Sequence, residues 1–467
     1  MAEHYDVVII GGGPGGYAAA LYGASAGLDI ALIEKAKVGG TCLHVGCIPA
    51  KELLETASVH RAVTGAATFG IEAGETTVDW GVTQDRKQQV VDQLFKGLSG
   101  LLKQRKVTVY DGVGSLHADR RVTVSGGESG DVEMTGDAVI VATGSVPRTI
   151  PGFEVDGELV MTSDEFLARR TLPATAVVIG GGAIGCEFAS TMADMGTQVT
   201  ILEALPKILP GVDEDAAKIV ERSFKKRNIT VKAGVAVTGH EPRPDGGTTV
   251  HFGEGESIDV DAVVVSVGRR PLTEGLGLDG TGVKVDERGF VVVDQRCRTD
   301  ETAVWAIGDV INTPALAHVG FAEGILAIRD ILGEDPVPVD YSRVPWCIYC
   351  HPEVAFAGHS EQSAKDAGLD VVVSKHRYIG NGRALIIGEP EGLVKVIALD
   401  RGDGTGGQIV GVHMVGPWVT EQLGQAYLAV NWEATVDEVS QFIQPHPSLS
   451  ELFGESVLAM TGRSLHG

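Results

Sequence analysis

The clearest pattern along the chain is a succession of hydrophobic and small residues that occurs twice. Residues 6–35 read DVVIIGGGPGGYAAALYGASAGLDIALIEK, and residues 176–204 read AVVIGGGAIGCEFASTMADMGTQVTILEA. Each segment begins with a β-branched run typical of a buried strand and passes through a glycine cluster into small residues typical of a helix. Each ends in a second β-branched run and a glutamate. We therefore predict two strand–helix–strand units.

The glycine clusters give these units their chemistry. The two copies match at positions 169 residues apart: Gly11 with Gly180, Gly13 with Gly182, Gly16 with Gly185, and Glu34 with Glu203. In a G-x-G-x-x-G motif the first glycine permits a tight turn, the second admits a pyrophosphate, and the third lets helix and strand pack closely. The acid at the end of each motif accepts hydrogen bonds from a ribose. No arginine follows Glu203 closely, which favours NAD over NADP.

Three further hydrophobic runs end in glycine turns and extend the predicted sheets. They cover residues 138–148, 263–271 and 304–310. The last run ends close to Asp309, and an acid at the carboxyl end of a strand lies where doubly wound sheets bind ligands. These patterns predict the α/β fold class, with two Rossmann-like dinucleotide-binding domains.

Length and charge narrow the class of protein. A chain of 467 residues is too long for one hydrophobic core, so about two to four domains are expected. The net charge of −24 repels nucleic acid phosphates and anionic lipids, so we expect no nucleic acid and no membrane partner. No apolar run approaches the roughly 18 residues that span a bilayer, and the first residues lack a signal-peptide pattern. Six cysteines do not make a disulfide scaffold, which favours a reducing, cytoplasmic location.

Two cysteines stand five residues apart in GGTCLHVGCIPAKELLE, residues 39–55. Proline is tolerated in the first turn of a helix, so Pro49 predicts that a helix begins near Cys47. The helix N-terminus, together with Lys51 one turn further on, would stabilise a thiolate at Cys47. Cys42 is expected in the loop before that helix, and a disulfide between the two requires Cα atoms within about 7 Å.

Three interpretations of this pair compete. A zinc site needs about four ligands, and no second Cys/His pair with finger-like spacing stands nearby. Two packed core cysteines are disfavoured because glycines flank them and a helix terminus activates one. The pattern favours a redox-active pair, and we expect no metal site. The other cysteines are expected to be packing residues, with Cys347 and Cys350 on opposite faces of one strand and Cys186 and Cys297 in other elements.

A histidine near the C-terminal end is a candidate base. A dithiol must lose protons before it attacks a disulfide, and histidine titrates in the useful range. The stretch QPHPSLSELFGESVLAM, residues 444–460, offers His446 with Glu451 five residues later. A local role for Glu451 is also open, because Ser448 and Glu451 have the spacing of a capping box. The two roles are compatible.

Taken in order, these segments resemble the two-dinucleotide flavoprotein disulfide reductases, and the resemblance covers essentially the whole chain. Its most specific part is the signature G-G-T-C-L-x-V-G-C-I-P-x-K. The resemblance implies FAD in the first dinucleotide site and NAD in the second. It implies that Cys42 exchanges with the substrate sulfurs and that Cys47 faces the flavin. It also implies that His446, oriented by Glu451, reaches the cysteines of the other subunit of an obligate homodimer.

The resemblance further implies which residues surround the cofactors. Lys51 is expected beside the flavin and paired with Glu187, Asp309 on the ribityl chain, and Gly114 near the adenosine. The remaining members of the cofactor-binding set are Thr41, Thr143, Gly268, Ala317 and the glycines and glutamates of the two motifs. The chain departs from the commoner family pattern at three positions: His44, Ala50 and Gln444.

For domain organisation, the resemblance implies an FAD-binding part made of residues 1–149 and 272–345. An NAD-binding part, 150–271, is inserted between them. Residues 332–345 are expected to be a linker, and 346–467 an α/β dimerisation domain.

For activity, the resemblance implies oxidation of protein-bound dihydrolipoamide to lipoamide, with a hydride passed to NAD⁺. The implied partner is a lipoyl-carrying acyltransferase, or the carrier protein, of a 2-oxoacid dehydrogenase or glycine-cleavage complex. Two alternatives are retained. One is an NAD(P)H-dependent reductase of a low-molecular-weight disulfide such as mycothione, and the other is a flavin redox sensor without turnover.

Overall fold

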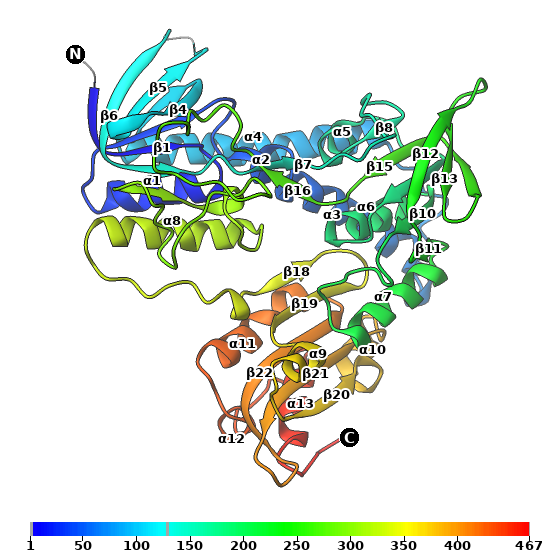
Figure 1. The fold of residues 1–467 in the computed structure, drawn as a ribbon. Helices are drawn as coiled ribbons and strands as arrows, with labels where there is room; N and C mark the ends of the chain where they lie inside the picture. Colours follow the sequence, from blue (N-terminus) through cyan, green and yellow to red (C-terminus); the bar gives the residue numbers. More distant parts are fainter. Residues whose placement is uncertain (1–2, 128–129, 467) are drawn as a thin grey trace.

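Both predicted strand–helix–strand units are present, and each belongs to a separate sheet (Figure 1). The structure is a computed structural model that describes residues 3–127 and 130–466. In each unit the two strands pair in parallel. The first unit is β1 (Glu3–Ile10), α1 (Pro14–Ser25) and β2 (Ile30–Glu34), and the second is β9 (Thr175–Ile179), α6 (Ala183–Asp194) and β10 (Gln198–Glu203).

The first sheet has seven strands, and the chain returns to it after making the second sheet. Its path is β3-β2-β1-β6-β5-β4, and β17 pairs with β6. The return strand β17 runs parallel to β6 and is followed by the turn Gly308–Val310 (η3). Asp309 therefore lies at the carboxyl end of the sheet. The further strands are β3 (Thr108–Asp111), β4 (Val113–Leu116), β5 (Arg121–Ser125), β6 (Val132–Val141) and β17 (Val304–Ala306).

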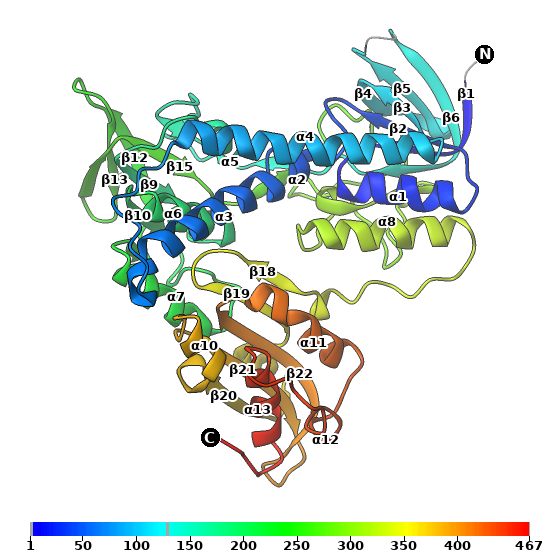
Figure 2. The same ribbon diagram turned by 180° about the vertical axis from the view of Figure 1, so that it is seen from behind.

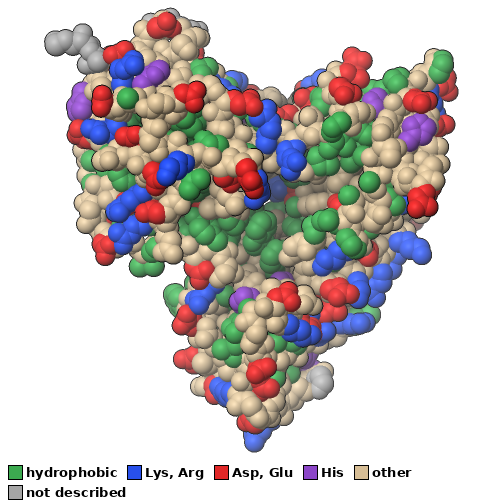
Figure 3. All heavy atoms as spheres, viewed as in Figure 1, with side chains coloured by type: hydrophobic (Ala, Val, Ile, Leu, Met, Phe, Trp, Pro, Cys, Tyr) green, Lys and Arg blue, Asp and Glu red, His purple; other side chains and the backbone are tan. Residues whose placement is uncertain are grey.

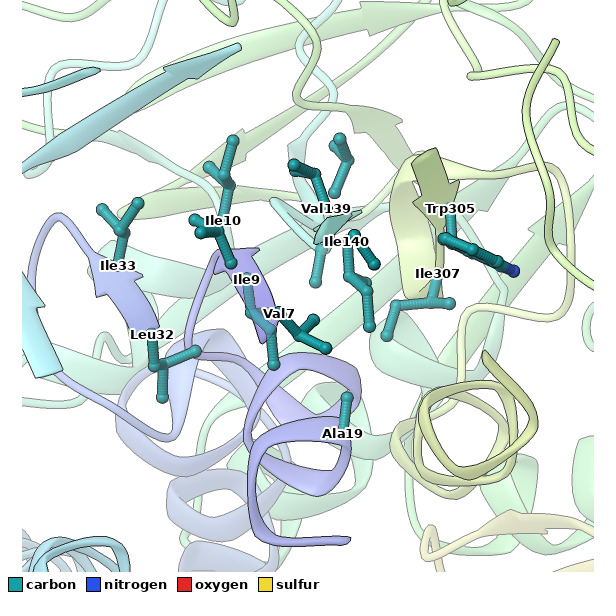
Figure 4. Packing of buried hydrophobic residues seen from close by; sticks show 14 of the residues in the cluster. Val7, Ile9, Ile10, Ala19, Leu32, Ile33, Val139, Ile140, Trp305 and Ile307 are labelled. Carbon is teal, nitrogen blue, oxygen red and sulfur yellow. The ribbon is translucent and has the colours of Figure 1, made fainter. Parts of the chain in front are cut away.

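Helices α1 and α8 (Ala317–Ile331) lie side by side under this sheet (Figures 1 and 2). Small residues permit their close contact, because a Cβ at Gly324 would lie 2.6 Å from the carbonyl oxygen of Gly15. The fully buried side chains of Val7, Ile9 and Ile140 fill the space between sheet and helices (Figure 4). This packing fixes the position of the first glycine turn at the end of β1.

The second sheet has the order β11-β10-β9-β15-β8, and a three-stranded antiparallel sheet, β12-β13-β14, lies beside it. The part of the chain built on the first sheet is called the first lobe, and the part built on the second sheet is called the second lobe. A two-stranded ribbon, β7 with β16, connects them. The strands are β7 (Ser145–Pro147), β8 (Val160–Met161), β11 (Thr230–Ala233), β12 (Val237–Pro242), β13 (Thr248–Phe252), β14 (Glu256–Val260), β15 (Ala262–Val265) and β16 (Arg269–Pro271), and the helices are α5 (Ser163–Ala168) and α7 (Glu214–Lys226).

Helices α3 (Cys47–Thr64) and α4 (Trp80–Gln104), which lie between the first and second units in the sequence, connect the two lobes. Figure 2 shows α4 running across both of them, with α3 packed against it. The short helix α2 (Gly40–His44) precedes α3. The 3₁₀ turns are η1 (Ala66–Phe69), η2 (Ala118–Arg120), η3 (Gly308–Val310), η4 (Tyr341–Arg343) and η5 (Tyr378–Gly380).

The C-terminal domain, from β18 onward, is an antiparallel sheet of five strands in the order β18-β19-β22-β21-β20. It lies below the two lobes in Figure 1. Its strands are β18 (Trp346–Ile348), β19 (Glu353–Gly358), β20 (Val371–Arg377), β21 (Leu393–Asp400) and β22 (Gly406–Gly416). Its helices are α9 (Glu361–Asp366), α10 (Gly382–Ile386), α11 (Val419–Asn431), α12 (Val436–Val439) and α13 (Glu451–Ala459).

A buried lysine ties this domain to the second lobe. Lys395 of β21 has a side chain that is 2% exposed, and its Nζ lies 2.9 Å from Asp213 Oδ2 and Asp215 Oδ2 at the start of α7. Glu361 Oε2 lies 2.8 Å from the same ammonium. A lysine is rarely buried without such partners. The cluster therefore fixes how the C-terminal domain sits against α7.

Among the described residues, no helix has both the length and the hydropathy needed to cross a bilayer.

Candidate active site

One large cavity of about 1580 Å³ lies between the two lobes. Single ligand sites are usually about 300–1,000 Å³, so the cavity has room for more than one ligand. Figure 3 shows the surface hollowed between the two upper lobes, with hydrophobic side chains in the hollow. The cavity is lined by parts of both glycine motifs, by Cys42 and Cys47, and by Asp309.

Each glycine turn is shaped for close backbone contact on one side and open space on the other. Gly11 and Gly180 have φ of 110° and 105°, and a Cβ there would lie 2.3 Å and 2.4 Å from the carbonyl oxygens of Ala142 and Ser266. The middle glycines differ, because a Cβ at Gly13 would meet nothing within 4 Å. Gly182 is equally open, and both line the cavity. Each turn therefore leaves a cradle at a helix N-terminus, where a pyrophosphate fits.

The last glycine of each motif does not face the cavity. A Cβ at Gly16 would lie 1.8 Å from the carbonyl oxygen of Gly11, and one at Gly185 would lie 2.0 Å from that of Gly180. These two positions let the helix pack on its own turn. Their part in cofactor binding is thus to shape the cradle.

Glu34 and Glu203 make equivalent hydrogen bonds. Glu34 Oε2 accepts from the Gly12 N–H at 2.8 Å and Oε1 from the Ala36 N–H at 2.9 Å. The matching bonds of Glu203 come from the backbone of Gly181 at 2.6 Å and Leu205 at 2.7 Å. A carboxylate has about four acceptor sites, so each retains capacity for ribose hydroxyls at the cavity wall.

The cysteine segment differs from expectation in one respect. The predicted helix begins at Cys47, but Cys42 lies in the one-turn helix α2 and not in a loop. The glycines Gly39 and Gly40, with φ of 106° and 57°, turn the chain into this helix. Gly46 brings the two cysteines together, because a Cβ there would lie 2.8 Å from the Thr41 carbonyl oxygen and 3.2 Å from the Cys42 Cα.

A hydrogen bond between the two thiols separates their acidities. Donation from Cys42 lowers the pKa of Cys47 to about 7 and raises the pKa of Cys42 well above its usual range. Burial opposes ionisation of Cys47, whereas the charge of Lys51 favours it. Cys47 is therefore the sulfur that ionises first, and both residues are thiols in the structure.

Lys51 and Glu187 are in contact, as expected. The Lys51 ammonium donates to Glu187 Oε1 at 3.0 Å and to Oε2 at 2.9 Å. Burial lowers the pKa of Lys51, but attraction to Glu187 outweighs it and leaves this pKa above its usual value. The pair joins α3 to α6 behind the reactive cysteines.

Asp309 is held by contacts that the sequence patterns did not predict. The Ser145 hydroxyl donates to Asp309 Oδ2 at 2.6 Å, and Arg269 Nε donates to the same hydroxyl oxygen at 2.7 Å. Behind the turn, the fully buried Glu323 accepts from the Gly308 N–H at 2.6 Å and from the Tyr341 hydroxyl at 2.9 Å. Ser145 of β7 thus contacts Asp309 directly, and Glu323 of α8 holds the turn that carries it.

Most of the predicted site residues share the one cavity. Its wall includes every expected cofactor residue except Gly16 and Gly185: Gly11, Gly13, Glu34, Thr41, Lys51, Gly114, Thr143, Gly180, Gly182, Glu187, Glu203, Gly268, Asp309 and Ala317. Two of the departures from the family pattern, His44 and Ala50, also line it. His44 Nε2 lies 2.9 Å from the Val38 carbonyl oxygen.

His446 and Glu451 lie outside this cavity, in the C-terminal domain. His446 Nδ1 is 2.7 Å from Glu451 Oε1, and the imidazole side chain is 79% exposed. Glu451 Oε2 also accepts from the Ser448 N–H at 2.7 Å, while the Glu451 N–H donates to Ser448 Oγ at 3.3 Å. Glu451 thus exchanges hydrogen bonds with Ser448, just before α13, and also contacts the imidazole. Gln444 packs near Gly454, where a Cβ would lie 2.6 Å from Gln444 Cγ.

The C-x-x-C segment also differs from expectation. Strand β18 ends at Ile348, so Cys350 lies beyond the strand and the two cysteines do not occupy opposite faces of one strand. Cys350 is fully buried, whereas Cys347 lines the cavity. Both are free thiols, as are Cys186 and Cys297. The described residues include no group of three or more His, Cys, Asp or Glu side chains that could hold a metal ion.

Two family models match the chain. Residues 5–324 match the pyridine nucleotide-disulphide oxidoreductase model, and residues 344–457 match the dimerisation domain of the same family. Curated relatives match along their full length. A dihydrolipoyl dehydrogenase of Bacillus subtilis is 42% identical over 100% of both chains, and one of Zymomonas mobilis is 37% identical, again over 100% of both.

Solved structures agree with this assignment. LpdA from Mycobacterium tuberculosis superposes with a TM-score of 0.91 at 25% identity, covering 98% of this chain and 99% of that one. The flavoprotein disulfide reductase RclA from Escherichia coli has a TM-score of 0.86 at 27% identity, covering 98% and 99%. The predicted fold class, with two dinucleotide-binding folds and a C-terminal dimerisation domain, is confirmed. The chain belongs to the pyridine nucleotide-disulphide oxidoreductase family.

Proposed function

We propose that this protein oxidises the dihydrolipoamide group of a carrier protein to lipoamide and passes the electrons to NAD⁺. The observation that carries the proposal is that Cys42 and Cys47 line the same cavity as both glycine motifs. Relatives named dihydrolipoyl dehydrogenase, 36–42% identical, support this choice of substrate.

The cysteines exchange with the substrate in two steps. One thiolate of the substrate attacks Cys42 of the Cys42–Cys47 disulfide, and Cys47 leaves as a thiolate. The second substrate thiol then displaces Cys42 and closes the lipoamide ring. Cys47 is the better leaving group because the start of α3 and the charge of Lys51 stabilise its thiolate.

The cofactors are FAD and NAD(H), and the two glycine cradles fit dinucleotides. We assign FAD to the cradle at Gly13 and Glu34, with Asp309 at its ribityl chain, and NAD to the cradle at Gly182 and Glu203. FAD, when bound, supplies two-electron chemistry that connects thiols to a nicotinamide. Lys51 would lie beside the flavin, and the remaining cavity residues Thr41, Gly114, Thr143, Gly268 and Ala317 would complete the two sites.

The NAD preference rests on Glu203 and its surroundings. Its carboxylate would repel a 2′-phosphate. Lys207, the nearest cation after it in the sequence, donates to the Val212 carbonyl oxygen at 3.0 Å.

We assign the base to His446, oriented by Glu451 and supplied by the partner subunit. The imidazole is exposed and lies outside its own chain's cavity, and the C-terminal domain matches the family's dimerisation domain. In a homodimer each His446 would take a proton from a substrate thiol at the other subunit's cysteines.

The proposal also includes the boundaries of the three domains and the cellular location of the protein. The FAD part would be residues 1–149 and 272–345, the NAD part 150–271 and the dimerisation part 346–467, of which residues 1, 2, 128, 129 and 467 lie outside the described structure. A reducing cytoplasm fits a chain with six cysteines, of which only Cys42 and Cys47 are assigned a disulfide. The partner would be the lipoyl-carrying subunit of a 2-oxoacid dehydrogenase or glycine-cleavage complex.

A steady-state assay tests the substrate. It compares dihydrolipoamide with mycothiol and glutathione disulfides, and NAD(H) with NADP(H). We expect the highest kcat/KM for dihydrolipoamide with NAD⁺. Faster turnover of mycothione with NADPH would contradict dihydrolipoamide as the substrate. A yellow protein without any turnover would indicate a redox sensor.

A further inference from the structure

Tyr349, just after strand β18, contacts both members of the Lys51–Glu187 pair. The Lys51 Nζ lies over the face of the Tyr349 ring, 4.9 Å from its centroid. The Tyr349 backbone N–H donates to Glu187 Oε1 at 2.9 Å. One residue of the C-terminal domain therefore touches the cation next to Cys47 and also the anion that neutralises it.

The position of Lys51 depends on a balance of attractions. Glu187 belongs to α6 and draws the ammonium toward the second dinucleotide motif, and its side chain is only 5% exposed. The negative face of the Tyr349 ring attracts the same ammonium from a second direction. Lysine has a long stem with several rotatable bonds, so an isolated ion pair fixes its head poorly. The ring supplies the missing constraint.

We propose that Tyr349 is a positioning residue that holds the Lys51 ammonium beside Cys47, so that docking of the C-terminal domain sets the charge environment of the reactive thiol. The inference rests on the proposed redox role of Cys47. It adds a residue from a domain that supplies no other contact to Lys51 among the hydrogen bonds, ion pairs and ring contacts of the described residues.

The charged and titratable groups near Cys47 and Tyr349 show which side chains can change the acidity of the Cys47 thiol. Cys47 interacts electrostatically with Cys42, Lys51, Glu187 and Tyr17. The charged or titratable groups near the Tyr349 hydroxyl and ring are Lys51, Cys347, Glu353 and Glu421. Of these, only Lys51 is a cation common to both sets. A change at Tyr349 therefore reaches Cys47 through Lys51.

The test measures how the alkylation rate of Cys47 depends on pH. Dithiothreitol-reduced holoenzyme is treated with iodoacetamide, and the Cys47 peptide is quantified by mass spectrometry. The wild-type rate should rise through a midpoint near pH 7, because the thiolate is the nucleophile. In Tyr349→Leu the midpoint should move up by about 0.5 units or more, because Lys51 no longer stays beside the thiolate.

Two further variants separate positioning from simple packing. Tyr349→Phe keeps the ring face and should keep the wild-type midpoint. Tyr427→Leu removes the same atoms from another half-buried tyrosine of the domain, on α11, and should also keep it. Should Tyr349→Leu fail to retain FAD, Tyr349→Met provides similar volume without a ring.

The proposal is overturned if the Leu or Met variant titrates like wild type, or if Phe shifts the midpoint as far as Leu. The measurement needs no turnover. The steady-state assay therefore tests dihydrolipoamide as the substrate, whereas the alkylation titration tests Tyr349 as a positioning residue. The two can fail independently.

Discussion

The Nζ of Lys51 lies 2.9 Å from Oε2 of Glu187, and this contact joins the helix that begins at Cys47 to the helix of the second dinucleotide motif. The Lys51–Glu187 ion pair therefore connects the helix of the reactive thiol to the second dinucleotide fold. The electrostatic state of Cys47 depends on that pair.

Replacing Lys51 by methionine should make Cys47 a weaker acid. Loss of a nearby opposite charge raises a thiol pKa, here by about one unit from about 7. At pH 7 the thiolate fraction would fall from about half to about one-tenth, so alkylation of Cys47 should slow about fivefold. Lys51→Arg, which retains the charge, should slow it much less. An unchanged rate in the methionine variant would show that Lys51 does not act on the thiol.

Removing the carboxylate of Glu323 should weaken FAD retention. In Glu323→Ala the Gly308 N–H and the Tyr341 hydroxyl lose their acceptor, so the turn that carries Asp309 loses its support. An unsatisfied buried donor costs about 1–3 kcal/mol, which corresponds to at least about a fivefold weaker affinity of apoprotein for FAD. Fluorescence titration with FAD measures this. Glu334→Ala, which removes a surface ion pair with Arg329 just beyond the same helix, should leave the affinity unchanged.

The Lys395 cluster should make stability depend on pH in a defined direction. Burial raises the pKa of Asp215, but hydrogen bonds from Lys375 and Lys395 outweigh it and hold this pKa at about 2. A hydrogen bond from Lys395 is the main reason that Glu361 also has a pKa of about 2. Because the unfolded values are about 4, both carboxylates stabilise the fold above that pH, and this stabilisation is lost as the pH falls through about 2.

Lys395→Met should therefore lower the free energy of unfolding by about 3 kcal/mol at neutral pH, because Asp213 is left buried without its cation. The deficit should be full above about pH 5 and should shrink as the pH falls toward 2. Urea unfolding of wild type and variant at a series of pH values measures it. A deficit that stays constant down to pH 2 would contradict this account of the cluster.

Mixing two inactive variants should restore activity if His446 serves the other subunit. In a dimer of one Cys47→Ser chain and one His446→Ala chain, one of the two sites keeps both an intact cysteine pair and an intact histidine. Random mixing gives half mixed dimers, so the refolded mixture should recover about one quarter of wild-type turnover. Recovery no greater than that of the two variants measured separately would place the histidine in the same chain as its cysteines.

The sequence predicted the local parts of this site well. The two G-x-G-x-x-G motifs constrain their own turns, and Pro49 marks the start of α3 because its missing N–H is tolerated only there. The expected local hydrogen bonds between Ser448 and Glu451 are present, but α13 begins at Glu451 and its N-cap is Ser450. Each of these features depends on neighbours within a few residues, which a pattern records directly.

The contacts that support the site from a distance were not predictable. Tyr349, Ser145 and Glu323 reach Lys51, Asp309 and the Gly308 turn from separate elements of the chain. Their neighbours in sequence give no sign of these partners. The short helix at Cys42 was missed because five residues are too few for a periodic pattern, and the end of β18 before Cys350 was missed because hydrophobic composition alone does not mark where a strand stops.

The central claim is that Cys42 and Cys47 carry electrons from dihydrolipoamide to NAD⁺, and differential alkylation tests it most directly. Oxidised holoenzyme is treated anaerobically with dihydrolipoamide, alkylated, and mapped by mass spectrometry, with and without excess NAD⁺ added before the alkylating agent. The account predicts that dihydrolipoamide makes Cys42 and Cys47, and no other cysteine, newly reactive, and that NAD⁺ reverses this. New labelling at other cysteines, or a Cys42–Cys47 pair that stays unlabelled while dihydrolipoamide is consumed, would contradict it.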